Sequence, residues 1–335
     1  MTSSLAFIPV SVLLGGTAAG ISGQASVQER LDRVRADLFS RAERVDEDVR
    51  ELKQILAIDP RSAEGHALLG IAYRAQGSPE MLGESVAEFR QALDLNPALV
   101  PVHFYLARVY LDLGRAPRAR EELESALAQA PGNPEFLALL GETERQLKNP
   151  QRAVDIIQQA LQADESLAQA RYYLGLALFD LGRRDDAIKE LERVVQSAPG
   201  VADPYLALGT AYLDAGRVRD AVQTLGQGAH IDPNLPELHI QLARAYRSSG
   251  LLEKAEAQLA LAAPKPGAAR TTSDYQHQQV EFDFYLERGL VKLQRGQLVA
   301  AGEAFKKVLE MDPNNEAAKR GLAEVLRKKK TGGRQ

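Results

Sequence analysis

Apolar residues recur along the chain in helix-length stretches, and their pattern repeats about every 34 residues. Proline marks this period: four residue pairs that close such stretches are separated by 34, 68 and 34 residues, namely Asn96-Pro97, Ala130-Pro131, Ala198-Pro199 and Asp232-Pro233. Within each repeat the apolar residues fall at helical spacing on one stripe. The pattern therefore predicts seven repeats, each made of two amphipathic helices.

Three positions keep one kind of side chain in all seven repeats when Pro131 is taken as position 32. Position 8 is small in every repeat: Gly70, Ala107, Gly141, Gly175, Gly209, Ala243 and Gly289. Position 20 is also small: Ser85, Ala119, Ala153, Ala187, Ala221, Ala255 and Ala301. Position 24 is large and apolar: Phe89, Leu123, Ile157, Leu191, Leu225, Leu259 and Phe305. We expect the small residues to let the two helices of a repeat approach closely, and position 24 to fill the space beside that contact.

Two other positions are nearly constant. Position 7 is leucine in six repeats, and the exception is Arg288. Position 15 is glycine in six of the seven, at Gly77, Gly114, Gly182, Gly216, Gly250 and Gly296. Glycine accepts φ > 0, so it predicts the end of the first helix. The proline near position 32 cannot continue a helix and therefore ends the second one.

This pattern resembles the tetratricopeptide repeat family, with its Leu-Gly pair, mid-repeat Tyr, Ala, Phe or Leu, and closing Pro. The resemblance covers residues 29 to about 328 and implies an all-α, right-handed superhelical solenoid of helix-turn-helix repeats with a C-terminal capping helix. We expect a degenerate leading repeat over 29–60, repeats one to six over 61–263, repeat seven over 282–313, a capping helix over 314–328 and a basic flexible tail over 329–335.

Two stretches depart from the pattern. The third repeat has Glu144 at the usual tyrosine position and Lys148 in place of glycine. Pro233 and Pro313 are 80 residues apart, against 68 for two repeats, so about 12 residues are inserted. We expect an insertion loop over 264–281, or a loop followed by an early start of the next helix around Ser273-Asp274.

Residues 1–25 carry no charge and contain a mostly apolar run, Leu5 to Leu14, followed by small residues. This layout is typical of a secretory signal peptide, except that no basic residue precedes the run. We expect an exported protein in a periplasmic or other extracytoplasmic space. The alternatives are a cytoplasmic protein and one anchored by this N-terminal segment, which would then be its only membrane contact.

Composition narrows the chemistry. The 45 acidic and 41 basic residues give a net charge of -4, which disfavours nucleic-acid binding. Cysteine is absent, which excludes disulfides and thiol catalysis. None of the common nucleotide-binding, hydrolase or zinc-protease motifs occurs. His66, His103 and His239 share position 4, where we expect rings packed between helices rather than metal ligands. We therefore predict no enzyme, no cofactor, no metal and no small-molecule substrate.

The resemblance implies that first helices line a concave groove through positions 2, 5, 9 and 12. The groove residues expected to bind a partner are Phe104, Arg108, Arg145, Tyr172, Leu176, Phe179, Leu206, Leu213, Arg244 and Arg247. They form an apolar patch flanked by arginines, which could pair with carboxylates of a peptide. The alternative is that these side chains pack against neighbouring helices. No groove position carries Lys or Asn, which disfavours the binding of heat-shock chaperone C-termini known in the family.

The predicted function is a non-catalytic scaffold or adaptor that presents this groove to a protein or peptide partner. The alternative is a structural subunit of an envelope or secretion assembly that contacts partners through its convex face or its ends.

Overall fold

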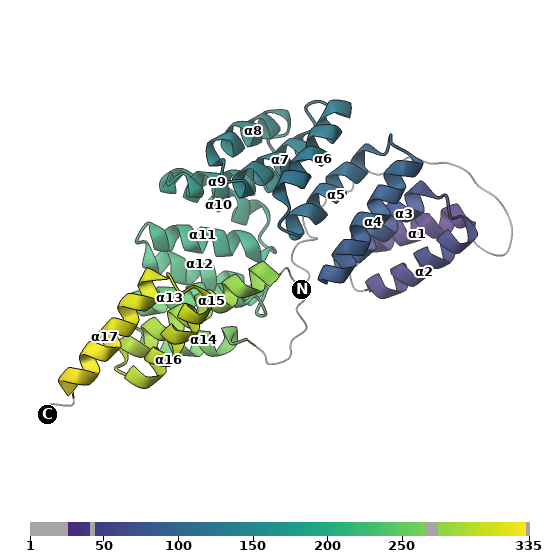
Figure 1. Cartoon of the computed structure of the whole chain (residues 1–335). Coiled ribbons are helices and arrows are strands. Elements are labelled where there is room, and N and C mark those ends of the chain that lie inside the picture. The colour runs from purple at the N-terminus through teal and green to yellow at the C-terminus, as the bar shows by residue number, and fades with distance from the viewer. Residues whose placement is uncertain (1–25, 41–43, 265–273, 333–335) are drawn as a thin grey trace. The chain divides into compact units, whose positions relative to one another are not determined.

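The computed structural model of the chain describes residues 26–40, 44–264 and 274–332, and these form only α-helices and short connections (Figure 1). The predictions for residues 1–25 lie outside the described residues. The leading helix pair is α1 (Val27–Ser40) and α2 (Val45–Ile58). Repeats one to three comprise α3 (Ala63–Gln76), α4 (Pro79–Leu95), α5 (Val100–Asp112), α6 (Ala116–Gln129), α7 (Pro134–Gln146) and α8 (Pro150–Ala163).

Repeats four to seven follow in the same order. Their helices are α9 (Ala168–Asp180), α10 (Arg184–Ser197), α11 (Ala202–Asp214), α12 (Val218–Ile231), α13 (Pro236–Ser248), α14 (Leu252–Ala262), α15 (Asp274–Gln294) and α16 (Leu298–Met311), and α17 (Glu316–Gly332) closes the array. The all-α repeat fold predicted from the sequence is confirmed.

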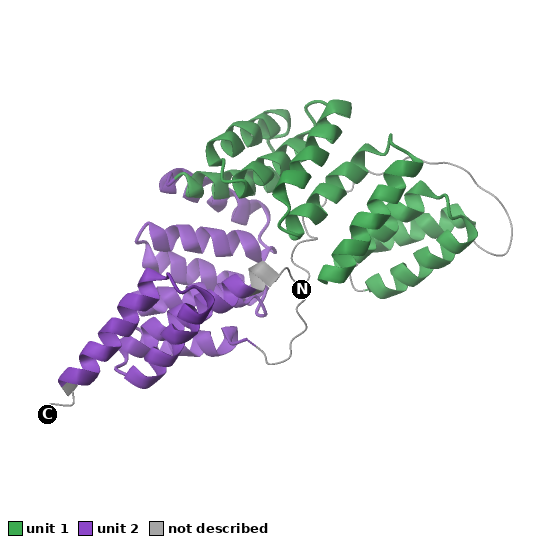
Figure 2. Cartoon of the chain, viewed as in Figure 1, with its two compact units in different colours: residues 1–181, 271–273 green, residues 182–270, 274–335 purple. Residues whose placement is uncertain are grey.

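The chain divides into two compact units, residues 1–181 with 271–273 and residues 182–270 with 274–335 (Figure 2). The division falls between α9 and α10, which are the two helices of repeat four. The two helices of a repeat pack on each other in repeats one to three of unit 1, and the same holds for repeats five to seven of unit 2.

Close packing between the two helices of a repeat depends on the small residue at position 8. A Cβ added to Gly70 would lie 2.8 Å from the ring of Phe89, and one added to Gly289 would lie 2.6 Å from the ring of Phe305. Ser85 at position 20 donates a hydrogen bond of 2.6 Å to the carbonyl of Gly70. The predicted contact among positions 8, 20 and 24 is therefore confirmed.

The turn between the two helices has the predicted left-handed residue. The six glycines at position 15 have φ between 67° and 75°. In repeat three the same conformation is held by Lys148, with φ of 65°. The turn geometry thus persists where the glycine is missing.

Two predicted boundaries are corrected. Helix α15 begins at Asp274, so residues 274–281 are helical and the predicted loop over 264–281 is too long. The sequence left open whether this stretch is all loop or a loop followed by an early helix start near Ser273-Asp274, and the structure has the early start. Helix α17 continues to Gly332, so the first four residues of the predicted tail, 329–332, are helical. Residues 326–330 are good helix formers, so they extend the helix into the predicted tail.

Candidate partner-binding surface

First helices of consecutive repeats contact one another within each unit, and their positions 5, 9 and 12 carry the residues predicted to bind a partner. We call these residues the first-helix surface. In unit 1 it comprises Phe104, Arg108, Arg145, Tyr172, Leu176 and Phe179 on α5, α7 and α9. In unit 2 it comprises Leu206, Leu213, Arg244 and Arg247 on α11 and α13.

Phe104 and Arg108 on α5 are buried, so they are not open to a partner as the sequence led us to expect. The ring of Phe104 packs against Phe136 of the next repeat at a centroid distance of 5.7 Å and meets the edge of Tyr105. The guanidinium of Arg108 lies 5.8 Å from the centre of the Phe104 ring, and burial lowers its pKa. The alternative, that groove side chains pack against neighbouring helices, is thus the right one for these two residues.

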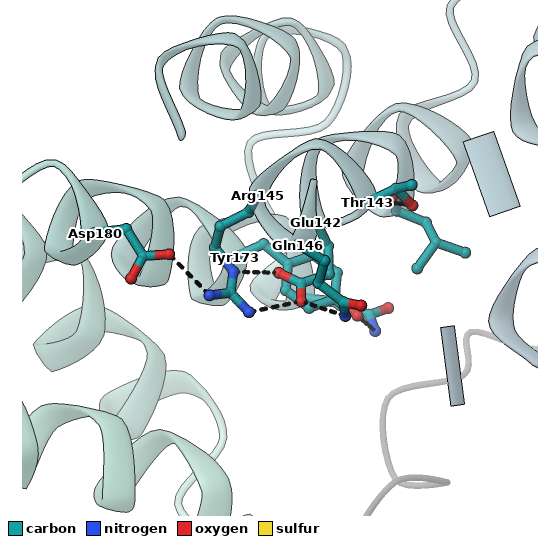
Figure 3. Close-up of polar contacts among 8 residues, drawn as sticks. Glu142, Thr143, Arg145, Gln146, Tyr173 and Asp180 are labelled. Atoms are coloured by element: carbon teal, nitrogen blue, oxygen red, sulfur yellow. Dashed lines mark hydrogen bonds and ion pairs between the residues drawn. The ribbon is translucent and has the colours of Figure 1, made fainter. Parts of the chain in front are cut away.

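Arg145 on α7 is committed to carboxylates of the protein itself (Figure 3). Its Nε and Nη2 donate to the two carboxylate oxygens of Glu142 at 2.8 and 2.9 Å, and its Nη1 donates to Asp180 on α9 at 2.9 Å. Burial alone would lower the pKa of Arg145, but the hydrogen bonds to both carboxylates outweigh it and raise the pKa. Gln146 also donates to Glu142, at 3.0 Å. The charge of Arg145 is therefore balanced before any partner arrives.

The apolar part of this surface in unit 1 lies on α9. Tyr172, Leu176 and Phe179 are all half-buried. The ring of Tyr172 packs at 5.8 Å on that of Tyr173, whose hydroxyl accepts a hydrogen bond from Gln169 at 2.8 Å. Burial raises the pKa of Tyr173. These three side chains keep enough exposed area to contact another molecule, and their helix is held by the Arg145–Asp180 pair.

In unit 2 one arginine is exposed and one is paired. Arg247 on α13 forms hydrogen bonds of 2.5 and 3.2 Å with Glu287 on α15, whose side chain is 7% exposed. Arg244, one turn earlier, is exposed. Burial raises the pKa of the nearby Asp283, whereas Gln279 and Arg244 act to lower it. Leu206 and Leu213 on α11 are half-buried. Of the four predicted arginines, Arg244 is thus the one open to a carboxylate of a partner.

Reasoning from sequence missed the acidic partners Asp180 and Glu287. A signal for the first was present: Arg74 and Arg145 both stand at position 12, and an aspartate stands at position 13 of each following repeat, at Asp112 and Asp180. Arg74 donates to Asp112 at 2.7 Å, just as Arg145 does to Asp180. An arginine at position 12 and an aspartate at the next position 13 therefore join consecutive first helices.

The three position-4 histidines join the helices of their own repeats. His66 and His103 lie 2.5 and 2.7 Å from Glu88 and Glu122, and His239 lies 2.8 Å from Gln258. Across the described ranges no group of three or more His, Cys, Asp or Glu side chains is placed to hold a metal ion. No helix among the described residues is both long enough and apolar enough to cross a membrane.

Sequence comparison places the chain among repeat proteins. One sequence model, described as tetratricopeptide repeat, matches residues 81–142, 178–237 and 212–270, and a second with the same description matches 282–315. A model of subunit 3 of the anaphase-promoting complex, cyclosome, matches 122–194. No curated protein sequence matches the chain.

Several solved structures have a similar fold. The human IFIT1 dimer with m7Gppp-AAAA has a TM-score of 0.68 and 19% identity, over 90% of this chain and 72% of that chain. The APC/C hetero-tetramer Cut9-Hcn1 has a TM-score of 0.68 and 14% identity, over 90% of this chain and 56% of that chain. PilF of Pseudomonas aeruginosa has a TM-score of 0.55 and 18% identity, over 67% of this chain and 97% of that chain. At these identities the likeness concerns the fold.

Proposed function

Because the chain belongs to the tetratricopeptide repeat family, whose fold in general serves protein interaction, we propose that it is a non-catalytic scaffold that binds a partner protein through its first-helix surface. The observation that carries this proposal is the set of half-buried apolar side chains on α9, Tyr172, Leu176 and Phe179. Aromatic side chains of this kind contribute much of the binding energy where one face is packed and the other is open.

The charged residues of the same surface have a different role in the proposal. Arg145 and Arg247 already pair with Glu142, Asp180 and Glu287, so a partner gains little by offering them another carboxylate. Arg244 is exposed and is available to an acidic group. We therefore assign binding in unit 1 to the apolar residues of α9, and we treat Arg244 as a separate contact for an acidic group on unit 2.

The test compares two double variants of the full chain as baits in cross-linked extracts of the native cells. Tyr172→Ala with Phe179→Ala removes two rings from α9. The matched control, Ile58→Ala with Leu326→Ala, truncates two exposed apolar residues of other helices, which are 64% and 54% exposed. Circular dichroism first establishes that both variants retain their helices.

We expect the ring-deleted variant to lose at least one protein that the wild type and the control both capture. For a purified pair, the affinity should fall about 30-fold, equivalent to about 2 kcal/mol, as is typical for an aromatic hot spot. Identical captured sets for all three baits would show that partners do not bind through these residues.

A further inference from the structure

Arg288 on α15 occupies position 7 of repeat seven, where the other six repeats have leucine. Those leucines are buried, between 1% and 7% exposed: Leu69, Leu106, Leu140, Leu174, Leu208 and Leu242. Arg288 is exposed. Repeat seven therefore lacks the apolar side chain that the other repeats bury at this point.

A hollow of about 200 Å³ lies beside Arg288, between α14 and α15 of unit 2. Its apolar lining includes Leu259 and Ala260 from α14 and Phe284 and Val291 from α15. The volume is enough for one leucine or phenylalanine side chain of another molecule. This hollow involves α14, a second helix, and shares no residue with the first-helix surface.

The connection between the two helices explains why a hollow can exist here. In the described chain, every other connection from a second helix to the following helix has four residues, as in 96–99, 130–133, 164–167, 198–201, 232–235 and 312–315. The connection between α14 and α15 has eleven, 263–273. A short connection holds the next helix tightly against the previous repeat, whereas a longer one relaxes that constraint.

The mouth of the hollow has an excess of positive charge. Glu256, which also lines it, already forms ion pairs with both Lys292 and Arg295. The guanidinium of Arg288 lies 5.9 Å from the centre of the Phe284 ring, and together with Lys292 and Arg295 it lowers the pKa of Glu256. Arg288 also lines a second hollow of about 390 Å³ toward α16, whose other charged residues are Lys306, Lys307, Glu303 and Glu310. An excess of positive charge, with Arg288 exposed, at an apolar hollow favours a ligand that is apolar and acidic.

We propose that this hollow is a second peptide-binding site, which takes an apolar side chain of a partner protein while an adjacent Asp or Glu of that partner pairs with Arg288. Charge complementarity favours such a partner over the chain's own residues 265–273, which carry Lys265 and Arg270 and no acidic residue. The site would give the protein a contact for acidic segments that is independent of the first-helix surface.

The test is a selection of random 12-residue peptides, displayed on phage, on the full-length protein. Two variants remove the site by different means. Arg288→Leu restores the residue that other repeats have, and Ala260→Trp fills the hollow from an exposed position. Arg219→Leu, an exposed arginine on α12, is the matched control. All variants are checked for helical content.

We expect the wild type and Arg219→Leu to select peptides that have an apolar residue next to Asp or Glu. Blocked synthetic copies of these peptides should bind Arg288→Leu and Ala260→Trp at least about tenfold more weakly, which corresponds to the loss of about one charge-assisted contact. Selection of no peptides, or of peptides whose binding is unaffected by both variants, would overturn the proposal.

Two further measurements separate this site from other surfaces. The Tyr172→Ala with Phe179→Ala variant should bind the selected peptides normally; a loss there would move these peptides to the first-helix surface and overturn the second site while leaving the proposed function intact. An oligonucleotide, AAAA, should not displace them. Displacement that depends on Arg288 would instead indicate a nucleic-acid site.

Discussion

At the scale of single residues, Lys148 stands out in the turn between α7 and α8. Its φ of 65° is close to the values of 67° to 75° that glycine has at position 15 of the other six repeats. A side chain at positive φ brings Cβ close to the backbone, which raises the energy by roughly 1 kcal/mol or more for a residue other than glycine. Lys148 is exposed, and its backbone N–H donates to the carbonyl of Arg145 at 2.9 Å, as the N–H of a glycine there also would.

We therefore expect Lys148→Gly to raise the free energy of unfolding by about 0.5–1 kcal/mol, measured by denaturant unfolding of the full chain. Gly114→Ala is the reverse control: its φ is 67° and a Cβ there would meet nothing within 4 Å, so only the backbone effect remains. That variant should lose a similar amount. A lower stability for Lys148→Gly would mean that the turn is not strained.

Residues that recur in all repeats could be predicted, whereas residues that occur once could not. The contact between positions 8 and 24 follows from seven copies of the same small and large pair. Glutamate occurs once, as Glu144, at a position where four of the seven repeats have tyrosine, and its side chain is fully buried. It accepts a hydrogen bond from Asn149 at 2.9 Å and lies 3.4 Å from Arg152. A substitution in one repeat carries no periodic signal, so its partners are known only once the helices are placed.

At the scale of helices, the pair Arg145–Asp180 ties α7 to α9 while Arg145 also neutralises Glu142. Both oxygens of Glu142 accept hydrogen bonds from Arg145, and the side chain of Glu142 is 8% exposed. Asp180, in contrast, is 38% exposed. Loss of the arginine would leave a buried carboxylate without its countercharge, which is more unfavourable than loss of the exposed aspartate.

We expect Arg145→Ala to lower the free energy of unfolding by about 2–3 kcal/mol and Asp180→Ala by about 0.5 kcal/mol. Adding Glu142→Gln to the Arg145→Ala variant should restore part of the stability, because it removes the uncompensated charge. Equal losses for the two single variants would show that the link between helices, and not the buried carboxylate, is the main contribution. If Arg145→Ala also weakens partner binding, the loss should be attributed to its lower stability unless a variant of the same stability binds normally.

The limits of individual helices were harder to predict than their existence. Helix α15 starts eight residues before the repeat pattern of 282–313 begins, and nothing in that pattern describes an extension on its N-terminal side. The first-helix surface shows the same limitation. Positions identify which helix face a residue occupies, but whether Phe104 is enclosed or Tyr172 remains half-open depends on the side chains of the neighbouring repeat.

At the scale of the whole chain, stability in a repeat array comes mainly from contacts between neighbours, so an end must be covered. Helix α17 provides this cover in unit 2. Its Ala318 and Val325 belong to one buried cluster with Phe305 and Val308 of α16, and a Cβ added to Gly321 would collide with the Phe305 ring. Without α17 the apolar face of repeat seven would be exposed to water.

Deletion of residues 316–335 should therefore lower the free energy of unfolding by at least about 2 kcal/mol and promote aggregation, measured by thermal unfolding with light scattering. Deletion of 333–335 alone is the control and should change neither. The replacement Val325→Asp in the full chain should reproduce the destabilisation by placing a charge in the cluster. An unchanged melting temperature after the larger deletion would mean that repeat seven needs no cover.

The pairing of position 8 with position 24 also limits the sites at which recombination could join two repeats in the gene. Repeats two and six combine alanine with leucine, as in Ala107 and Leu123, whereas repeats one and seven combine glycine with phenylalanine, as in Gly70 and Phe89. A crossover in the turn between the two helices would join Ala107 to a phenylalanine, and its methyl group would overlap the ring. A crossover at the proline that closes a repeat would keep each pair together. Recombination, natural or engineered, should therefore be tolerated between repeats and penalised within them.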